Sequence, residues 1–78
     1  LAAHDNWVRS VILLPSGKHI LSCSDDKTIS VCDVKGERVL KTIKDAHKHF
    51  ITSMALSPLT MTLVTASVDK SLHVWSCS

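Results

Sequence analysis

An internal repeat constrains the fold of this chain more than any other feature of its sequence. The segment SDDKTISVC at 24–32 recurs 43 residues later as SVDKSLHVW at 67–75. Residues 1–35 and 44–78 align without a gap and are identical at nine positions. In each copy a Ser-x-Asp-Lys turn precedes alternating polar and apolar residues, which is typical of a strand. A period in the low forties with four short strands per repeat is the pattern of a β-propeller blade.

The pattern within each copy predicts an all-β fold. Strands are expected at 7–13, about 19–23, 28–33 and 38–43, separated by turn residues such as Pro15, Gly17 and Gly36. The first strand becomes continuously apolar, which predicts a strand covered on both faces. The second copy matches these strands around 50–56, 63–64 and 72–74. The sequence therefore predicts a propeller fragment, with one complete four-stranded repeat at 1–43 and three strands of a second at 44–78.

The size of the chain predicts that it is marginally stable alone. Seventy-eight residues form at most one small domain, and two blades cannot close a ring, since about three or more repeats are usually needed. The start at Leu1 rather than Met is interpreted as an excised piece or a fragmentary record. The third strand of the second repeat would be an open edge. We therefore expect the 78-residue chain to be unstable or self-associating; a cooperative thermal transition from a dilute monomer would contradict this.

Composition argues against several functional classes. Nine Lys and Arg against seven Asp and Glu leave a net charge of +2, and the scattered cations do not predict nucleic-acid binding. No apolar run approaches the ~20 residues of a membrane span. The three cysteines, Cys23, Cys32 and Cys77, form no close pair, so we interpret them as small buried hydrophobes in a reducing compartment.

Four polar positions recur at fixed offsets in the two copies. They are His47, Thr65, Asp69 and Trp75 in the second copy, and His4, Ser22, Asp26 and Cys32 in the first. An indole N–H, a hydroxyl, an imidazole and a carboxylate can form one closed hydrogen-bond chain. Such a chain satisfies polar groups that are costly to bury, so we interpret the set as a structural tetrad.

Two other interpretations of these residues are weaker. A hydroxyl with His and Asp is also the composition of a hydrolase triad, but the set is duplicated, the hydroxyl varies between Ser22 and Thr65, and no nucleophile elbow surrounds either residue. His47 and His49 could share one side of an extended segment. Two imidazoles fall short of the three or four ligands that zinc requires, so no metal site is predicted.

The motifs resemble a known family. A His followed 22 residues later by Asp, and then by Val-Trp ending six residues further on, resembles the WD40 repeat. The string HDNWVR at 4–9 together with DDKT at 25–28 is similar to the lissencephaly branch of WD40 proteins. The resemblance implies a seven-bladed propeller without enzymatic activity or cofactor, in the cytoplasm and associated with the cytoskeleton or centrosome. It also implies a regulator of the cytoplasmic dynein motor and of its microtubule attachment, and a non-catalytic partner of platelet-activating-factor acetylhydrolase catalytic subunits.

The same resemblance suggests where a partner binds. In a propeller, the loops entering the first strand and the turns between the second and third strands line one rim. Trp7 and Lys27 match positions that face dynein in the lissencephaly relatives, and Arg9 is an additional candidate. A buried packing role for Trp7 remains the alternative. The counterparts in the second copy are His49, Phe50 and Lys70, of which Phe50 is expected in the core.

Three positions depart from the family pattern. Cys32 replaces the usual Trp, so we expect His4 and Asp26 to lose part of their network. Ala3 and Ala46 replace the Gly that usually precedes the His, where a positive φ would be strained. Ser30 replaces an outward Arg of the third strand. The alternative function is therefore a divergent or inert WD40 scaffold that binds another protein complex.

Overall fold

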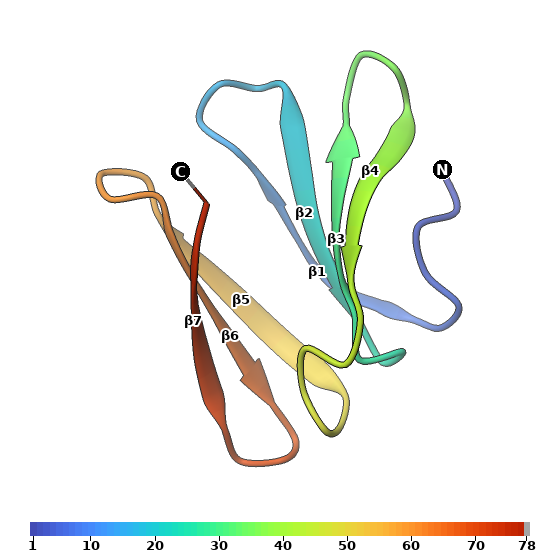
Figure 1. Cartoon of the computed structure of the whole chain (residues 1–78), viewed down its shortest axis with the longest axis vertical. Helices are drawn as coiled ribbons and strands as arrows, with labels where there is room; N and C mark the ends of the chain where they lie inside the picture. The colour runs from blue at the N-terminus through green and yellow to red at the C-terminus, as the bar shows by residue number, and fades with distance from the viewer. Residues whose placement is uncertain (78) are drawn as a thin grey trace.

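The computed structural model describes residues 1–77 as two antiparallel sheets (Figure 1). Each strand pairs with its neighbours in sequence, in the orders β1-β2-β3-β4 and β5-β6-β7. The strands are β1 (Val8–Leu13), β2 (His19–Ser24), β3 (Ile29–Asp33), β4 (Arg38–Ile43), β5 (Ile51–Ser57), β6 (Thr62–Ser67) and β7 (Leu72–Ser76). Residues 1–77 contain no helix that could cross a membrane. The two sheets confirm the predicted all-β fold class.

The turns before β3 and β7 share one geometry. Lys27 and Lys70 adopt φ of 70° and 71°, and their amides donate to the carbonyls of Ser24 and Ser67, both at 3.1 Å. Ala3 and Ala46 are not among the residues with positive φ, so the strain considered there does not arise. The left-handed conformation falls on the Lys of each Ser-x-Asp-Lys turn.

The hydrophobic core lies between the two sheets. β1 and β2 contact β5, while β4 and β7 diverge on either side (Figure 1). Alternate residues of β2 and β3 face the second sheet because side chains along a strand alternate between its faces. The buried residues of this cluster are Leu21, Cys23, Ile29, Ala46, Ile51, Met54 and Leu63.

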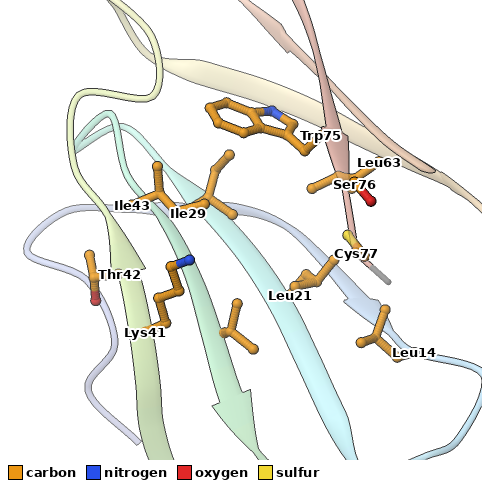
Figure 2. Close-up of a pocket in the computed structure, with 11 residues that line it drawn as sticks. Leu14, Leu21, Ile29, Lys41, Thr42, Ile43, Leu63, Trp75, Ser76 and Cys77 are labelled. Carbon is orange, nitrogen blue, oxygen red and sulfur yellow. The ribbon is translucent and has the colours of Figure 1, made fainter. Parts of the chain in front are cut away.

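An apolar groove opens where the sheets diverge. Its volume is about 490 Å³, and Ile29, Ile43 and Trp75 line it from β3, β4 and β7 (Figure 2). Cys77, which is half-buried, lies at its end. Cys23 and Cys32 are buried, and burial raises the pKa of the Cys23 thiol to about 11.

Two expectations about burial were wrong. β1 was expected to be covered on both faces, but Val11 and Leu13 are each 60% exposed because only one face of β1 meets the second sheet. Phe50 was expected in the core, but it is 38% exposed and its ring contacts His49 edge to face. A continuous apolar run identified the strand but not the number of its neighbours.

Candidate functional site

The second polar set is centred on His47, whose side chain has no exposed surface. His47 lies in the connection between β4 and β5, and Thr65 lies in the middle of β6. The His47 Nε2 atom lies 2.7 Å from Thr65 Oγ1, and the Trp75 indole N–H donates to the same oxygen at 3.0 Å. One hydroxyl thus joins the connecting loop to β6 and β7.

Ser71, which sequence reasoning missed, connects His47 to the Asp69 carboxylate. The His47 Nδ1 atom lies 3.0 Å from Ser71 Oγ and 3.5 Å from Asp69 Oδ2, and the Ser71 hydroxyl donates to Asp69 Oδ1. Asp69 also accepts hydrogen bonds from the amides of Lys48 and Ser71, at 3.0 and 2.8 Å. The hydrogen bond from Ser71 and these amide donors hold the pKa of Asp69 well below its usual range. The signal for Ser71 was available, since Thr28 occupies the same position of the first repeat.

A second imidazole packs on His47. The rings of His47 and His73 are stacked, with centroids 4.0 Å apart and an interplanar angle of 12°. The His73 Nδ1 atom lies 2.8 Å from the carbonyl oxygen of Ala46. Burial lowers the pKa of His47, and the neighbouring His73 lowers it further, while Asp69 opposes this change. The imidazole of His47 therefore favours its neutral form.

The first polar set repeats the geometry at His4. The His4 Nε2 atom lies 2.8 Å from Ser22 Oγ, and His4 Nδ1 lies 3.1 Å from Asp26 Oδ2 and 2.9 Å from Thr28 Oγ1. Burial of Asp26 opposes its ionisation, but the donors from Thr28, the Asp5 amide and His4 outweigh burial and lower its pKa. His4 and Asp26 keep these contacts, so the expected loss of part of their network is confined to the indole donor at Ser22.

Two substitutions in β3 change the surroundings of the first set. Cys32, at the position of Trp75, is only 3% exposed. Ser30, which replaces the outward Arg of the family pattern, is fully buried and donates to the Ala3 carbonyl at 3.3 Å. Ser30 and His73 thus bind the carbonyl of the residue before each central His. The position is structural in both repeats rather than outward.

The geometry of the second set is unlike that of a hydrolase triad. Thr65 is fully buried, so its oxygen presents no surface to a substrate. That oxygen already contacts both His47 and Trp75.

The two histidines considered as metal ligands have other hydrogen-bond partners. His49 Nδ1 accepts a hydrogen bond from the amide of Phe50 at 2.8 Å, and the two ring nitrogens of His47 contact the hydroxyls of Ser71 and Thr65. Residues 1–77 contain no group of three or more His, Cys, Asp or Glu side chains arranged to hold a metal ion.

An exposed aromatic residue lies at the start of β1. Trp7 is 70% exposed, so the alternative of a buried packing role for its side chain does not apply to this structure. The Arg9 guanidinium lies 5.1 Å from the centroid of the Trp7 ring, within cation–π range. Asp25 accepts from both Nε and Nη2 of Arg9, at 2.7 and 2.6 Å, and this pairing lowers the pKa of Asp25. The Asp25 amide donates to the Trp7 carbonyl at 3.0 Å.

Lys27 lies at the same end of the molecule as Trp7. The start of β1, the β2–β3 turn, the β4–β5 connection and the β6–β7 turn all lie toward the lower end in Figure 1, opposite the other turns. Lys27 is exposed in the second of these and Lys70 in the fourth. Both lysines therefore lie in turns at the same end of the two sheets.

The second repeat lacks the salt-bridged aromatic cluster of the first. Phe50 stands at the position of Trp7, but Thr52 and Val68 replace the ion pair of Arg9 and Asp25. We call Trp7, Arg9 and Asp25 the aromatic rim cluster. Sequence reasoning selected Trp7, Arg9 and Lys27 but missed Asp25. This residue links the β2–β3 turn to the segment before β1.

Comparison with known proteins identifies the repeat. The family model for the WD domain, G-beta repeat, matches residues 1–33 and 37–76. Nuclear distribution protein nudF 2 of Talaromyces marneffei is 49% identical over 59 residues, covering 74% of this chain and 13% of that protein. Nuclear distribution protein PAC1 of Yarrowia lipolytica is 40% identical over 82 residues, covering 96% of this chain and 18% of that protein. Lissencephaly-1 homolog 1 of Paramecium tetraurelia is 41% identical over 78 residues, covering 100% of this chain and 19% of that protein.

These similarities fix the family but extend over only part of each relative. The chain spans less than a fifth of the length of the three proteins named above. The family model covers nearly the whole chain and both polar sets. On that match, the chain belongs to the WD40-repeat family of protein-binding repeats.

Proposed function

We propose that this chain is part of a protein-binding propeller that regulates cytoplasmic dynein and its attachment to microtubules. Similarity to nuclear distribution proteins and to a lissencephaly-1 homolog supports this function. In this proposal, residues 1–43 and 44–78 are two successive blades of a non-catalytic scaffold associated with the cytoplasmic cytoskeleton. The tetrads hold each blade together, and the rim beside the first tetrad binds the partner.

The exposed Trp7 ring is the observation that carries this proposal. Large aromatic and Arg side chains supply most of the energy at protein interfaces. Trp7 is 70% exposed, and Arg9 is held beside its ring by two charge-assisted hydrogen bonds to Asp25. The cluster is therefore ordered before a partner arrives, which lowers the entropy cost of binding.

The charges around Trp7 indicate what the partner surface contains. Arg9 is paired with Asp25, while Lys27 at the same rim is exposed. The complementary surface has an apolar pocket for the indole and an acidic side chain within reach of Lys27. Mutation of Lys27 should therefore slow association, whereas loss of Trp7 should speed dissociation.

The experiment measures binding of the full-length protein that contains this chain to the purified dynein motor domain. Trp7→Ala should weaken binding by more than tenfold, because truncation of a central aromatic anchor costs about 2 kcal/mol or more. The matched control is Phe50→Ala, which removes the ring at the same position of the second repeat. Equal binding by wild type and Trp7→Ala would remove Trp7 from the interface.

A scaffold for another complex remains the second candidate. The replacement of the family Trp by Cys32 favours a diverged repeat. Acetylhydrolase catalytic subunits are a further partner that the lissencephaly resemblance implies, so they belong to the first candidate. Failure of the wild-type protein to bind either the dynein motor or these subunits would favour the second candidate.

A further inference from the structure

A second histidine stands beside the central histidine of the second repeat. His73 occupies the position of Ser30, and its ring stacks on the ring of His47 with centroids 4.0 Å apart. The His73 Nδ1–H donates to the Ala46 carbonyl, which leaves the Nε2 atom to take up a proton. The first repeat has a serine hydroxyl at this position instead. The second repeat therefore places two titratable rings face to face.

The hydrogen bonds around His47 have a fixed direction. Because the Ser71 hydroxyl donates to Asp69, its oxygen accepts from His47 Nδ1–H. On the other side of the ring, the Trp75 N–H donates to Thr65 Oγ1, and the Thr65 hydroxyl donates to His47 Nε2. A neutral imidazole has one N–H donor and one acceptor nitrogen, and both are used here. The network therefore fits the neutral ring.

A proton added at His47 Nε2 conflicts with this network. The Thr65 oxygen would have to accept from both His47 and Trp75, and its own hydrogen would turn away from the imidazole. Thr65 is fully buried, where an unsatisfied donor is costly. The added charge would also face the ring of His73, so protonation of either ring disfavours protonation of the other.

Other charged groups surround His47 on several parts of the fold. They are Asp69 from the β6–β7 turn, Asp45 and Lys48 from its own connection, and Lys27 in the β2–β3 turn, whose carbonyl accepts the Ala46 amide. Asp45 and Lys48 carry opposite charges, and the Lys27 side chain is exposed. Asp69 favours protonation of His47, but burial and the neighbouring His73 outweigh it and lower the pKa of His47.

The first polar set accommodates the same proton more readily. Cys32 supplies no indole N–H to Ser22, so the Ser22 oxygen can accept from a protonated His4 and still leave two directions open for its own hydrogen. Ser30 binds the Ala3 carbonyl without adding a titratable ring. The residues at 30 and 32 thus lack both features that oppose protonation in the second repeat.

We propose that the stacked pair of His47 and His73 is an acid-sensitive latch on the β4–β5 connection. The neutral rings hold the connection on β6 and β7. His47 binds a proton more readily when the connection is open, so the closed state is favoured above the ordinary pKa of histidine and is lost as the pH falls. The connection then opens while the first polar set stays closed. Because His49 and Phe50 follow in the same segment, opening changes the rim of the second repeat.

Hydrogen exchange measured by mass spectrometry on the full-length protein that contains this chain tests the latch. The amides of Lys48 and Asp5 are equivalent, and each donates to an Asp carboxylate at 3.0 Å, so peptides 44–50 and 1–7 give a matched comparison. After correction for the intrinsic effect of pH on exchange, protection of 44–50 should fall by about fivefold or more between pH 7 and pH 5, while protection of 1–7 stays constant. Asp69 does not titrate in this interval, because its hydrogen-bond donors hold its pKa well below the usual range.

Two variants remove the two opposing features separately. His73→Gln keeps an N–H donor for the Ala46 carbonyl but cannot become charged, and Trp75→Phe frees an acceptor position on Thr65. Each should reduce the pH-dependent loss of protection in 44–50 to about half of the wild-type loss or less, because protonation of the closed state becomes easier. His19→Gln, which removes a histidine of β2 outside both polar sets, is the control and should show the wild-type loss.

Each variant is compared with its own protection at pH 7, so a general loss of stability does not imitate the effect. If Trp75→Phe is already unprotected at pH 7, His73→Gln decides the test together with His73→Ser, which copies the first repeat. Protection of 44–50 that is independent of pH in the wild-type protein would overturn the proposal. An equal loss in 1–7, or the full wild-type loss in the variants, would overturn it as well.

Discussion

The two sheets are built from the same repeat, but equivalent residues in them differ in their exposure to water. Ile29 and Leu72 occupy equivalent positions of β3 and β7, but they are 1% and 69% exposed. The first sheet is covered by the second on this side, whereas no described residue covers the second sheet in the same way. The comparison teaches that the repeat specifies an apolar face, while the neighbouring sheet determines whether that face is buried.

The polar sets differ less than the apolar faces do. The distances from His Nε2 to the hydroxyl are 2.8 Å in the first repeat and 2.7 Å in the second. The distances from Nδ1 to the hydroxyl of Thr28 and of Ser71 are 2.9 and 3.0 Å. This agreement holds although Cys32 replaces the Trp, so the His–carboxylate part of the set does not depend on the indole.

Truncation of equivalent apolar residues in the two sheets should give the largest difference in the free energy of unfolding. Ile29→Ala should lower the free energy of unfolding by about 2–5 kcal/mol, because it leaves a cavity among buried side chains. Leu72→Ala removes a side chain that is already largely solvated and should cost about 0.5 kcal/mol or less. Urea denaturation of both variants measures the difference. Equal losses would show that the face of the second sheet that carries Leu72 is covered in solution.

Removing only the indole donor should give an intermediate effect. Trp75→Phe keeps an aromatic ring in the groove but removes the N–H that bonds to Thr65. The expected loss is about 1 kcal/mol, the usual net contribution of one hydrogen bond. Urea denaturation measures it, with Trp7→Phe as the control for an exposed indole. A loss as large as that of Ile29→Ala would show that the indole holds the whole tetrad together.

Acidification should weaken the second polar set through His47. Its pKa in the folded chain is lowered from the ordinary value of 6.5, chiefly by burial. Between these two values the unfolded chain binds more protons, so stability falls as the pH drops through 6.5 and stops falling below the folded-state pKa. His47→Gln should reduce this dependence between pH 7 and pH 5, as followed by the urea midpoint. An equal pH dependence in wild type and His47→Gln would contradict the assignment.

The ion pair of the aromatic rim cluster should give the smallest change in stability. Asp25→Val copies the residue of the second repeat and removes the partner of Arg9. Because Arg9 is partly exposed, salt screens the interaction, and the small loss in the urea midpoint should disappear at high ionic strength. Arg9→Thr, which also copies the second repeat, leaves the buried Asp25 carboxylate without its partner and should therefore cost more stability than Asp25→Val. A loss that persists in salt would point to packing of Arg9 on Trp7 instead.

The sequence predicted the strands, and the structure brings together the His, hydroxyl and carboxylate positions of each polar set. Alternation of polar and apolar residues and the Ser-x-Asp-Lys turns are local signals, so the strand bounds agree to within one or two residues except in β6, which continues to Ser67 rather than ending at residue 64. Ser71, Thr28 and Asp25 were missed because their roles depend on which side chains the turn brings within reach of His47, His4 and Arg9. The exposure of Phe50 was missed because an aromatic residue at the start of a strand is equally compatible with the core.

The sequence by itself therefore determined the repeat, the order of strands and the two His-centred sets, since each follows from residues close together in one unit. Only the tertiary structure decided which apolar positions are buried, as Ile29 and Leu72 show. The physical reason is that side-chain alternation assigns a residue to a face of its sheet, whereas burial requires a second surface packed against that face.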